Sequence, residues 1–150
     1  MTADQPIAPI QRAFLEGARR AVMATEAPNG RPRLVPICFV LDPDGPVLYT
    51  PLDDKPKRSD DRLALARIQD IAARPAVTIL ADRWDEDWSR LAWLRCDGRA
   101  WLLPPPGPGH AAAVAALREK YPRYASHDIG SRPLIAVTIE RSVGWGDLGG

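Results

Sequence analysis

The sequence lacks any long uninterrupted run of apolar residues, which limits the environments in which the chain can work. No apolar stretch approaches the roughly 18 residues that a membrane-spanning helix needs. Residues 1–5 contain neither a basic segment nor an apolar one, so we expect no secretory signal peptide. The sequence therefore predicts a soluble, cytoplasmic protein.

Cysteine and histidine are also scarce, with two residues of each. Cys38 and Cys96 both lie in apolar, strand-like runs and are interpreted as buried thiols rather than a disulfide pair. His110 and His127 have no cysteine or acidic cluster at ligand spacing, so no metal site is expected. The formal net charge is only +1, which gives no concentrated basic face for nucleic acid.

Several well-known functional motifs are missing as well. The chain has no Gly-x-Gly-x-x-Gly, no phosphate-binding P-loop and no Gly-x-Ser-x-Gly nucleophile motif. The spacing of Cys and His gives no support for a paired nucleophile. If the chain is an enzyme, a bound organic cofactor is expected to perform the difficult chemical step, and no catalytic side chain stands out.

The first third of the chain predicts one helix and three short strands. Pro9 can begin a helix, and apolar residues at 10, 14, 15 and 18 then share one face. Strand-like segments follow at 22–25, 33–41 and 47–50, separated by turn sequences at 28–30 and 42–45. Pro36 cannot donate a ladder hydrogen bond, so it predicts an edge strand or a bulge. Three strands joined by tight turns predict an antiparallel meander.

The rest of the chain predicts further strands and two more helices within a single domain, residues 1–150. Helices are expected to begin near Ser59 and to cover residues 110–121. Extended segments are expected at 77–81, 91–96, 99–103 and 134–140, and the last of them is expected to close the sheet. Asp97-Gly98 is either a hairpin turn or a bulge in one long strand. The predicted fold is mainly β (α+β): a small antiparallel barrel with peripheral helices.

Three cations are packed into four residues at Lys55-Pro56-Lys57-Arg58, between a strand end and a helix start. Cationic side chains and the free N–H groups of a helix start both favour phosphate, so this loop predicts a phosphate site. The alternative is a solvated loop whose charges pair with neighbouring acids. Tyr49 and Thr50 precede the loop, where the Thr50 hydroxyl either contacts a ligand or satisfies nearby backbone.

A second unusual segment, residues 84–90, interleaves Trp84 and Trp88 with acidic residues, and Trp93 follows it. Aromatic side chains beside a cleft can stack on a planar ring. A dimer contact, or a loop packed on the barrel, explains the same pattern equally well. Trp101 and Trp145 are interpreted as core or interface residues.

With these elements in place, the chain resembles the pyridoxamine 5′-phosphate oxidase-like (PPOX class) flavoproteins, in particular their branch of coenzyme F420-dependent oxidoreductases. The resemblance extends over nearly the whole chain and is most specific at residues 31–39, 49–50 with 55–58, 74–77 and 85–90. It implies an FMN-binding-like, split antiparallel β-barrel. It also implies a homodimer that binds its cofactor at the subunit interface.

The resemblance further assigns roles to single residues. Basic residues match positions that contact the cofactor phosphate: Lys55, Lys57, Arg58 and Arg33. Residues of two strands match positions beside the tricyclic ring: Val35, Pro36, Ile37, Tyr49 and Thr50. Trp88 matches a position that the second subunit can supply.

Two departures argue against the oxidation of pyridoxamine phosphate itself. Family members that form pyridoxal phosphate carry a lysine where this chain has Cys38, and their C-terminal Arg and His pattern is absent here. The leading hypothesis is an oxidoreductase that uses coenzyme F420 to transfer a hydride to or from a small organic substrate. Two alternatives stay open: an FMN-dependent oxidoreductase of the same class, and a protein that binds a flavin or deazaflavin without catalysis.

Overall fold

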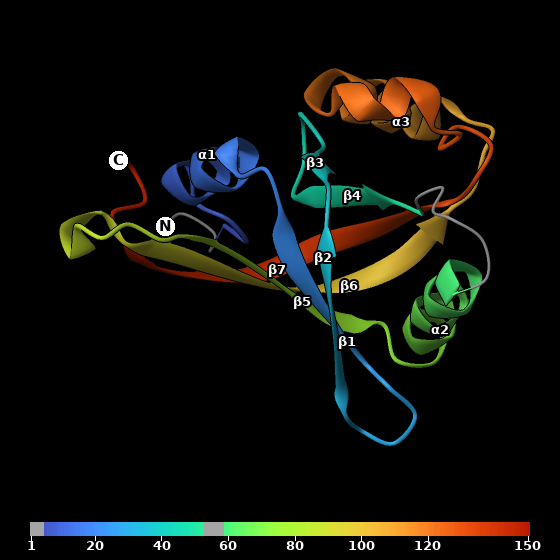
Figure 1. Ribbon diagram of the computed structural model, residues 1–150, viewed down its shortest axis with the longest axis horizontal. Helices are drawn as coiled ribbons and strands as arrows, with labels where there is room; N and C mark the ends of the chain where they lie inside the picture. Colours follow the sequence, from blue (N-terminus) through green and yellow to red (C-terminus); the bar gives the residue numbers. More distant parts are fainter. Residues whose placement is uncertain (1–4, 53–58) are drawn as a thin grey trace.

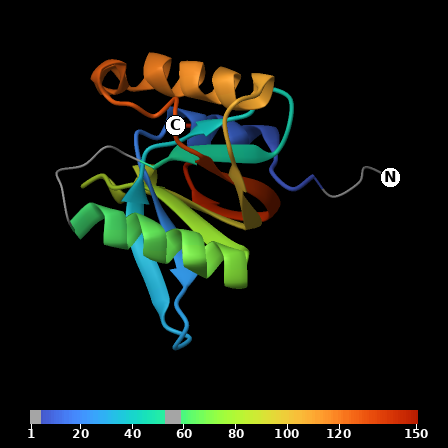
Figure 2. The same ribbon diagram turned by 90° about the vertical axis from the view of Figure 1, so that its right-hand side faces the viewer.

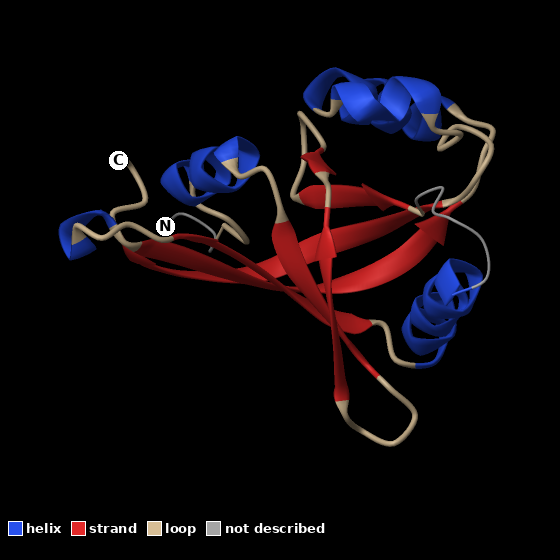
Figure 3. Ribbon diagram, viewed as in Figure 1, coloured by secondary structure: helices blue, strands red, loops and turns tan. Residues whose placement is uncertain are grey.

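The computed structural model describes residues 5–52 and 59–150, with backbone alone for residues 59–65, and shows an antiparallel sheet flanked by helices (Figure 1, Figure 3). The described residues form seven strands, which pair in the order β2-β1-β5-β6-β7-β4-β3. Their bounds are β1 (Ala21–Glu26), β2 (Pro32–Ile37), β3 (Val40–Leu41), β4 (Val47–Pro51), β5 (Ala76–Arg83), β6 (Ala92–Leu103) and β7 (Leu134–Gly146). The predicted mainly β fold with peripheral helices is confirmed.

The hairpin between β1 and β2 follows directly from its turn residues. Gly30 has a φ of 82°, a left-handed conformation that glycine adopts without a steric penalty. Its N–H donates to the carbonyl oxygen of Ala27 at 2.8 Å, and the N–H of Ala27 donates to Arg31 O at 2.9 Å. The predicted turn at residues 28–30 is therefore confirmed.

The two edges of the sheet, β2 and β3, follow each other in the chain. Ile37 ends β2 and Val40 begins β3, and three residues extend at most about 11 Å. The sheet must therefore curl until its two edges come together, which produces the split barrel. Pro36 lies in an edge strand as predicted, since β2 pairs with β1 alone among the described strands.

The predicted three-stranded meander is wrong. β3 pairs with β4, but β4 then pairs with β7, so the β1–β2 and β3–β4 hairpins lie at opposite edges of the sheet. The turn sequences specify each hairpin locally. They do not specify the next partner of β4, which comes from the last strand of the chain.

The centre of the sheet is formed by the two longest strands, β6 and β7. β6 is one continuous strand with a bulge between Asp97 and Gly98, so the bulge alternative is correct and the hairpin alternative is not. A Cβ atom on Gly98 would lie 2.3 Å from the backbone oxygen of Thr138, so only glycine permits this approach of β7. β7 extends to Gly146 and lies between β6 and β4, rather than ending at residue 140 and closing the sheet.

Within residues 5–52 and 59–150, three α-helices and two short 3-10 helices cover the sheet. They are α1 (Pro9–Gly17), α2 (Ser59–Ala73), α3 (Pro108–Lys120), η1 (Trp88–Arg90) and η2 (Pro122–Ser126). Leu15 of α1 and Met23 of β1 belong to the main core, whereas Val114 and Leu117 of α3 form a second core with Val40. Figure 2 shows the sheet lying between α3 and α2. No helix among the described residues is long and apolar enough to cross a membrane.

The predicted burial of cysteines and tryptophans is only partly correct. Cys96 is buried, but Cys38 is half-buried because it lies in the short crossing between β2 and β3; both thiols are free. Trp101 and Trp145 are 41% and 53% exposed, so their interpretation as core residues is wrong. A role for both at an interface stays a prediction.

Candidate functional site

An apolar groove of about 530 Å³ lies on the face of the sheet that points away from the core. Along β1, Met23 and Thr25 are buried, whereas Val22 and Ala24 alternate to the other face and line the groove. In β5, Leu80 reaches the groove from between two buried neighbours. The period of two along each strand therefore gives the sheet two apolar faces, and only one of them is the core.

Large side chains on this face are unusually exposed. Trp84, Trp93 and Trp145 line the groove, and Trp93 lies opposite Trp145 in the β6–β7 register. The exposed fractions are 65% for Trp84, 53% for Trp145 and 64% for Leu34. Single exposed apolar residues are common, but a contiguous group of them marks a surface that binds a ligand or another protein.

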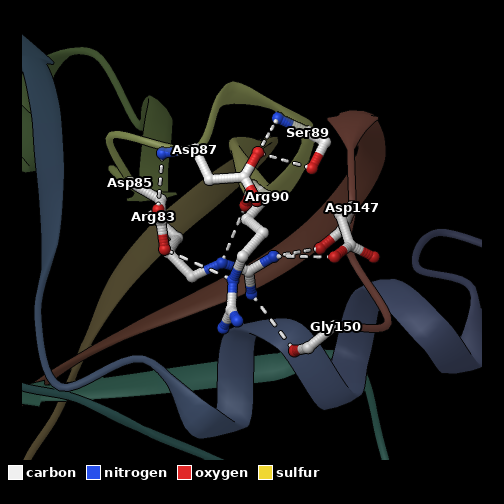
Figure 4. Close-up of polar contacts among 7 residues, drawn as sticks. All are labelled: Arg83, Asp85, Asp87, Ser89, Arg90, Asp147 and Gly150. Carbon is white, nitrogen blue, oxygen red and sulfur yellow. Dashed lines mark hydrogen bonds and ion pairs between the residues drawn. The ribbon is translucent and has the colours of Figure 1, made fainter.

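The segment that carries Trp84 and Trp88 is held by a polar network centred on Arg83 (Figure 4). The Nε of Arg83 donates to the carbonyl oxygen of Arg90 at 2.9 Å, and its Nη1 donates to Gly150 O at 3.3 Å. Its Nη2 donates to the carbonyl oxygen of Asp147 and lies 3.6 Å from Asp147 Oδ2. One guanidinium thus ties the β5–β6 connection to residues that follow β7.

The interleaved acids fix the same segment from within. Asp85 Oδ1 accepts from the N–H of Asp87 at 2.8 Å, and Asp87 Oδ1 accepts from Ser89 N at 3.1 Å and Ser89 Oγ at 2.7 Å. The bonds from Ser89 lower the pKa of the Asp87 carboxyl below its ordinary value. Asp85 and Asp87 therefore hold the turn, and the Trp84 indole N–H donates to Glu86 Oε1 at 3.1 Å. Trp88 is 69% exposed, so packing on the barrel does not explain it.

Arg33 points to the opposite side of the sheet from the groove. It is the cross-strand partner of Thr25, and its Nε donates to Asp70 Oδ2 at 2.7 Å. The Thr25 hydroxyl donates to the same oxygen at 3.0 Å, and Arg74 Nη2 lies 3.7 Å from Asp70 Oδ1. Asp70 is only 1% exposed. The predicted phosphate ligand Arg33 is thus anchored by a buried carboxylate.

Sequence reasoning did not identify Asp70, although one signal was available. Asp70 lies in the last turn of α2, where the negative end of the helix dipole disfavours an acid. An acid in such a place needs cationic partners, which are here Arg33 and Arg74. Ser59 precedes Asp70 by about 16 Å along the helix axis, so Arg33 lies near the far end of α2 from the helix start.

The other predicted site residues occupy several parts of the molecule. In β2, Val35 is half-buried, Pro36 is exposed and Ile37 belongs to the main core. In β4, Thr50 is buried, and the Tyr49 hydroxyl donates to Asp42 Oδ2 at 3.0 Å. Burial, followed by the Asp42 carboxylate, raises the pKa of Tyr49.

Trp88 lies in η1 and does not line the groove. Lys55, Lys57 and Arg58 lie outside the described residues, so their phosphate contacts stay a prediction. Of the predicted set, the structure brings Arg33, Val35, Pro36 and Ile37 together on one edge strand.

Comparison with known proteins identifies a family whose sequence pattern matches most of this chain. Residues 7–146 match the family described as pyridoxamine 5′-phosphate oxidase. No curated protein sequence matches the chain.

Solved structures share the fold at low sequence identity. A conserved hypothetical protein from Mycobacterium tuberculosis is 17% identical with a TM-score of 0.72, over 97% of this chain and 89% of that one. The heme storage protein HutZ from Vibrio cholerae is 13% identical with a TM-score of 0.68, over 93% and 94%. An FAD-binding protein from Mesorhizobium loti is 22% identical with a TM-score of 0.61, over 88% and 87%.

Proposed function

The chain belongs to the pyridoxamine 5′-phosphate oxidase family, and we propose from this membership that it is a cytoplasmic oxidoreductase that uses the deazaflavin coenzyme F420. The proposed reaction transfers a hydride to or from a small organic substrate. The bound cofactor supplies the reactive carbon of its central ring, while the protein binds, orients and shields it. The observation that carries the proposal is the edge strand β2, on which a buried carboxylate anchors Arg33.

Arg33 is the described residue that best supports phosphate binding. Its Nε is engaged by Asp70, no other described residue accepts a hydrogen bond from it, and its side chain is 35% exposed. The two Nη groups of a guanidinium match two oxygens of a phosphate group. F420 and FMN both carry a ribityl phosphate, so this site suits either one. We propose that Lys55, Lys57 and Arg58 bind the anionic part of the cofactor at the other end of α2 from Arg33.

The outer edge of β2 suits a planar ring with polar atoms on its rim. Because β2 pairs only with β1 among the described strands, one side of its backbone is available to a ligand. We place the tricyclic ring along Val35, Pro36 and Ile37, with Tyr49 and Thr50 at the neighbouring strand end. These residues would surround the ring with apolar side chains, which exclude water from the reacting atoms.

We propose that a second copy of the chain covers the apolar groove. An isologous contact would bury Leu34, Leu80 and Trp145 against their own symmetry mates, which removes a large apolar surface from water. Trp88, exposed beside the groove, would then reach the cofactor of the partner subunit. In this arrangement the homodimer completes the site.

Ligand binding tests the proposal directly. Purified protein is titrated with F420, FMN, FAD and hemin while tryptophan fluorescence is followed, and the reduced F420 complex is then mixed with a panel of conjugated acceptors. We expect F420 to bind most tightly and its oxidation to depend on the protein. Tighter binding of FMN would support the FMN-dependent alternative, and binding without turnover would support a carrier.

Preferential binding of hemin would overturn the proposal. The chain has two histidines, the usual axial ligands of heme iron. His110 lies in α3, where its Nε2 is 2.7 Å from Arg132 O, and His127 follows η2. Neither histidine lines the apolar groove.

A further inference from the structure

The carboxylate of Asp70 is the most completely buried charged group among the described side chains. Its side chain is 2% exposed, yet it contacts three polar side chains, two from strands and one from the residue that follows its own helix. Arg33 Nε and Thr25 Oγ1 both donate to Oδ2, at 2.7 and 3.0 Å. Arg74 Nη2 lies 3.7 Å from Oδ1, while Arg74 Nε donates to Glu26 O at 3.0 Å.

This arrangement holds the guanidinium of Arg33 in one orientation. A free arginine side chain has four rotatable bonds, and ordering it on binding would weaken an anion contact. Here the Nε–H is already bound, and the acceptor oxygen is itself fixed by Thr25, whose strand position is directly opposite Arg33. The Nη groups are left for a ligand, since no described residue accepts from them.

We propose that Asp70, with Thr25, is a positioning residue that orients Arg33 to bind the phosphate of the cofactor. Asp70 does not touch the ligand in this scheme. It acts through Arg33, and its negative charge also offsets part of the positive charge of Arg33 and Arg74. This inference rests on the proposed function, because it requires a phosphate-bearing ring cofactor.

The test compares a phosphorylated cofactor with its phosphate-free counterpart. Affinities for FMN and riboflavin are measured for the wild type, Asp70→Asn, Thr25→Val and Arg33→Ala; if the wild type prefers deazaflavin, F420 and its ribityl deazaflavin core, which lacks both the phosphate and the acidic tail, are used instead. Arg33→Ala should weaken binding of the phosphorylated ligand by about ten- to a hundredfold. Asp70→Asn should weaken it by about tenfold, the lower end of that range. Neither variant should change binding of the phosphate-free ligand.

Two controls separate positioning from general stability. Arg74→Ala removes the other cation near Asp70 and should leave the ratio of the two affinities unchanged. In the Arg33→Ala background, Asp70→Asn should have no further effect on that ratio, because the residue through which it acts is gone. Retained binding of the phosphate-free ligand reports that each variant is folded.

The outcomes distinguish this inference from the proposed function. If the wild type prefers the phosphorylated ligand but Asp70→Asn keeps the same ratio, the positioning role is refuted and the proposed function stands. Equal losses for both ligands would also refute it, since they indicate a structural role alone. If the wild type binds none of these flavins or deazaflavins, the proposed function itself fails.

Discussion

Substitution of Gly98 by alanine should destabilise the protein by opening the centre of the sheet. The new Cβ would lie 2.3 Å from Thr138 O and 2.8 Å from Val137 Cγ1. The valine methyl can rotate, but the Thr138 backbone is held between β6 and β4 and has no room to move. Overpacking against a fixed backbone costs about 2–3 kcal/mol. For a chain of this length that corresponds to a fall in melting temperature of about 5–10 °C.

Thermal unfolding followed by circular dichroism measures this effect, with Gly109→Ala as the matched control. Gly109 lies in the first turn of α3, and a Cβ there would meet nothing within 4 Å. Alanine is favoured over glycine in a helix by up to about 1 kcal/mol, so the control should melt at or above the wild-type temperature. If Gly98→Ala melted together with the control, the close approach of β7 to the bulge would be disproved.

Three further predictions concern charge, hydrogen bonding and assembly. Lys120 lies 4.0 Å from the centre of the Phe39 ring, and burial, followed by Arg19, lowers its pKa from 10.5 to about 8. Between about pH 8 and pH 10.5 the unfolded chain therefore binds more protons than the folded protein, so the free energy of unfolding should rise with pH across this window. Urea unfolding of Lys120→Met should show a smaller rise, because the variant has no lysine to titrate there. Tyr121→Phe leaves the buried Phe39 N–H, which donates to the Tyr121 hydroxyl at 3.2 Å, without this partner and should cost about 1–3 kcal/mol in urea unfolding. Leu80→Glu places a charge in the apolar groove and should convert the proposed dimer to a monomer in sedimentation experiments; a variant that stays dimeric would place the interface elsewhere.

Much of the local structure could be predicted from the sequence because it depends on neighbouring residues. Asn29 and Gly30 specify a turn through backbone conformation alone, and Pro36 indicates an edge because it has no N–H to donate. The pairing of β4 with β7 could not be predicted in this way. Apolar alternation shows that a strand has a buried face, but it does not show which distant strand lies beside it.

The candidate site likewise contains one residue that the sequence identifies and another that only the fold reveals. Arg33 could be identified from its strand and its resemblance to a phosphate-binding position. Its partner Asp70 is far away in the sequence and was missed, because a single acid in a helix has many explanations until the fold brings it to an arginine. Trp145 was interpreted as a core or interface residue, and its exposure removes only the first of these interpretations.

The position of β4 has a consequence for the order in which the molecule forms. β4 has no neighbour on that side until Val137, the partner of Leu48, has been synthesised, and the two residues lie far apart in the sequence. Such distant pairing is slow to form and leaves an open strand edge in the growing chain. Nascent chains that stop before β7 should therefore recruit chaperones or aggregate, and the barrel should close only after β7 has been synthesised.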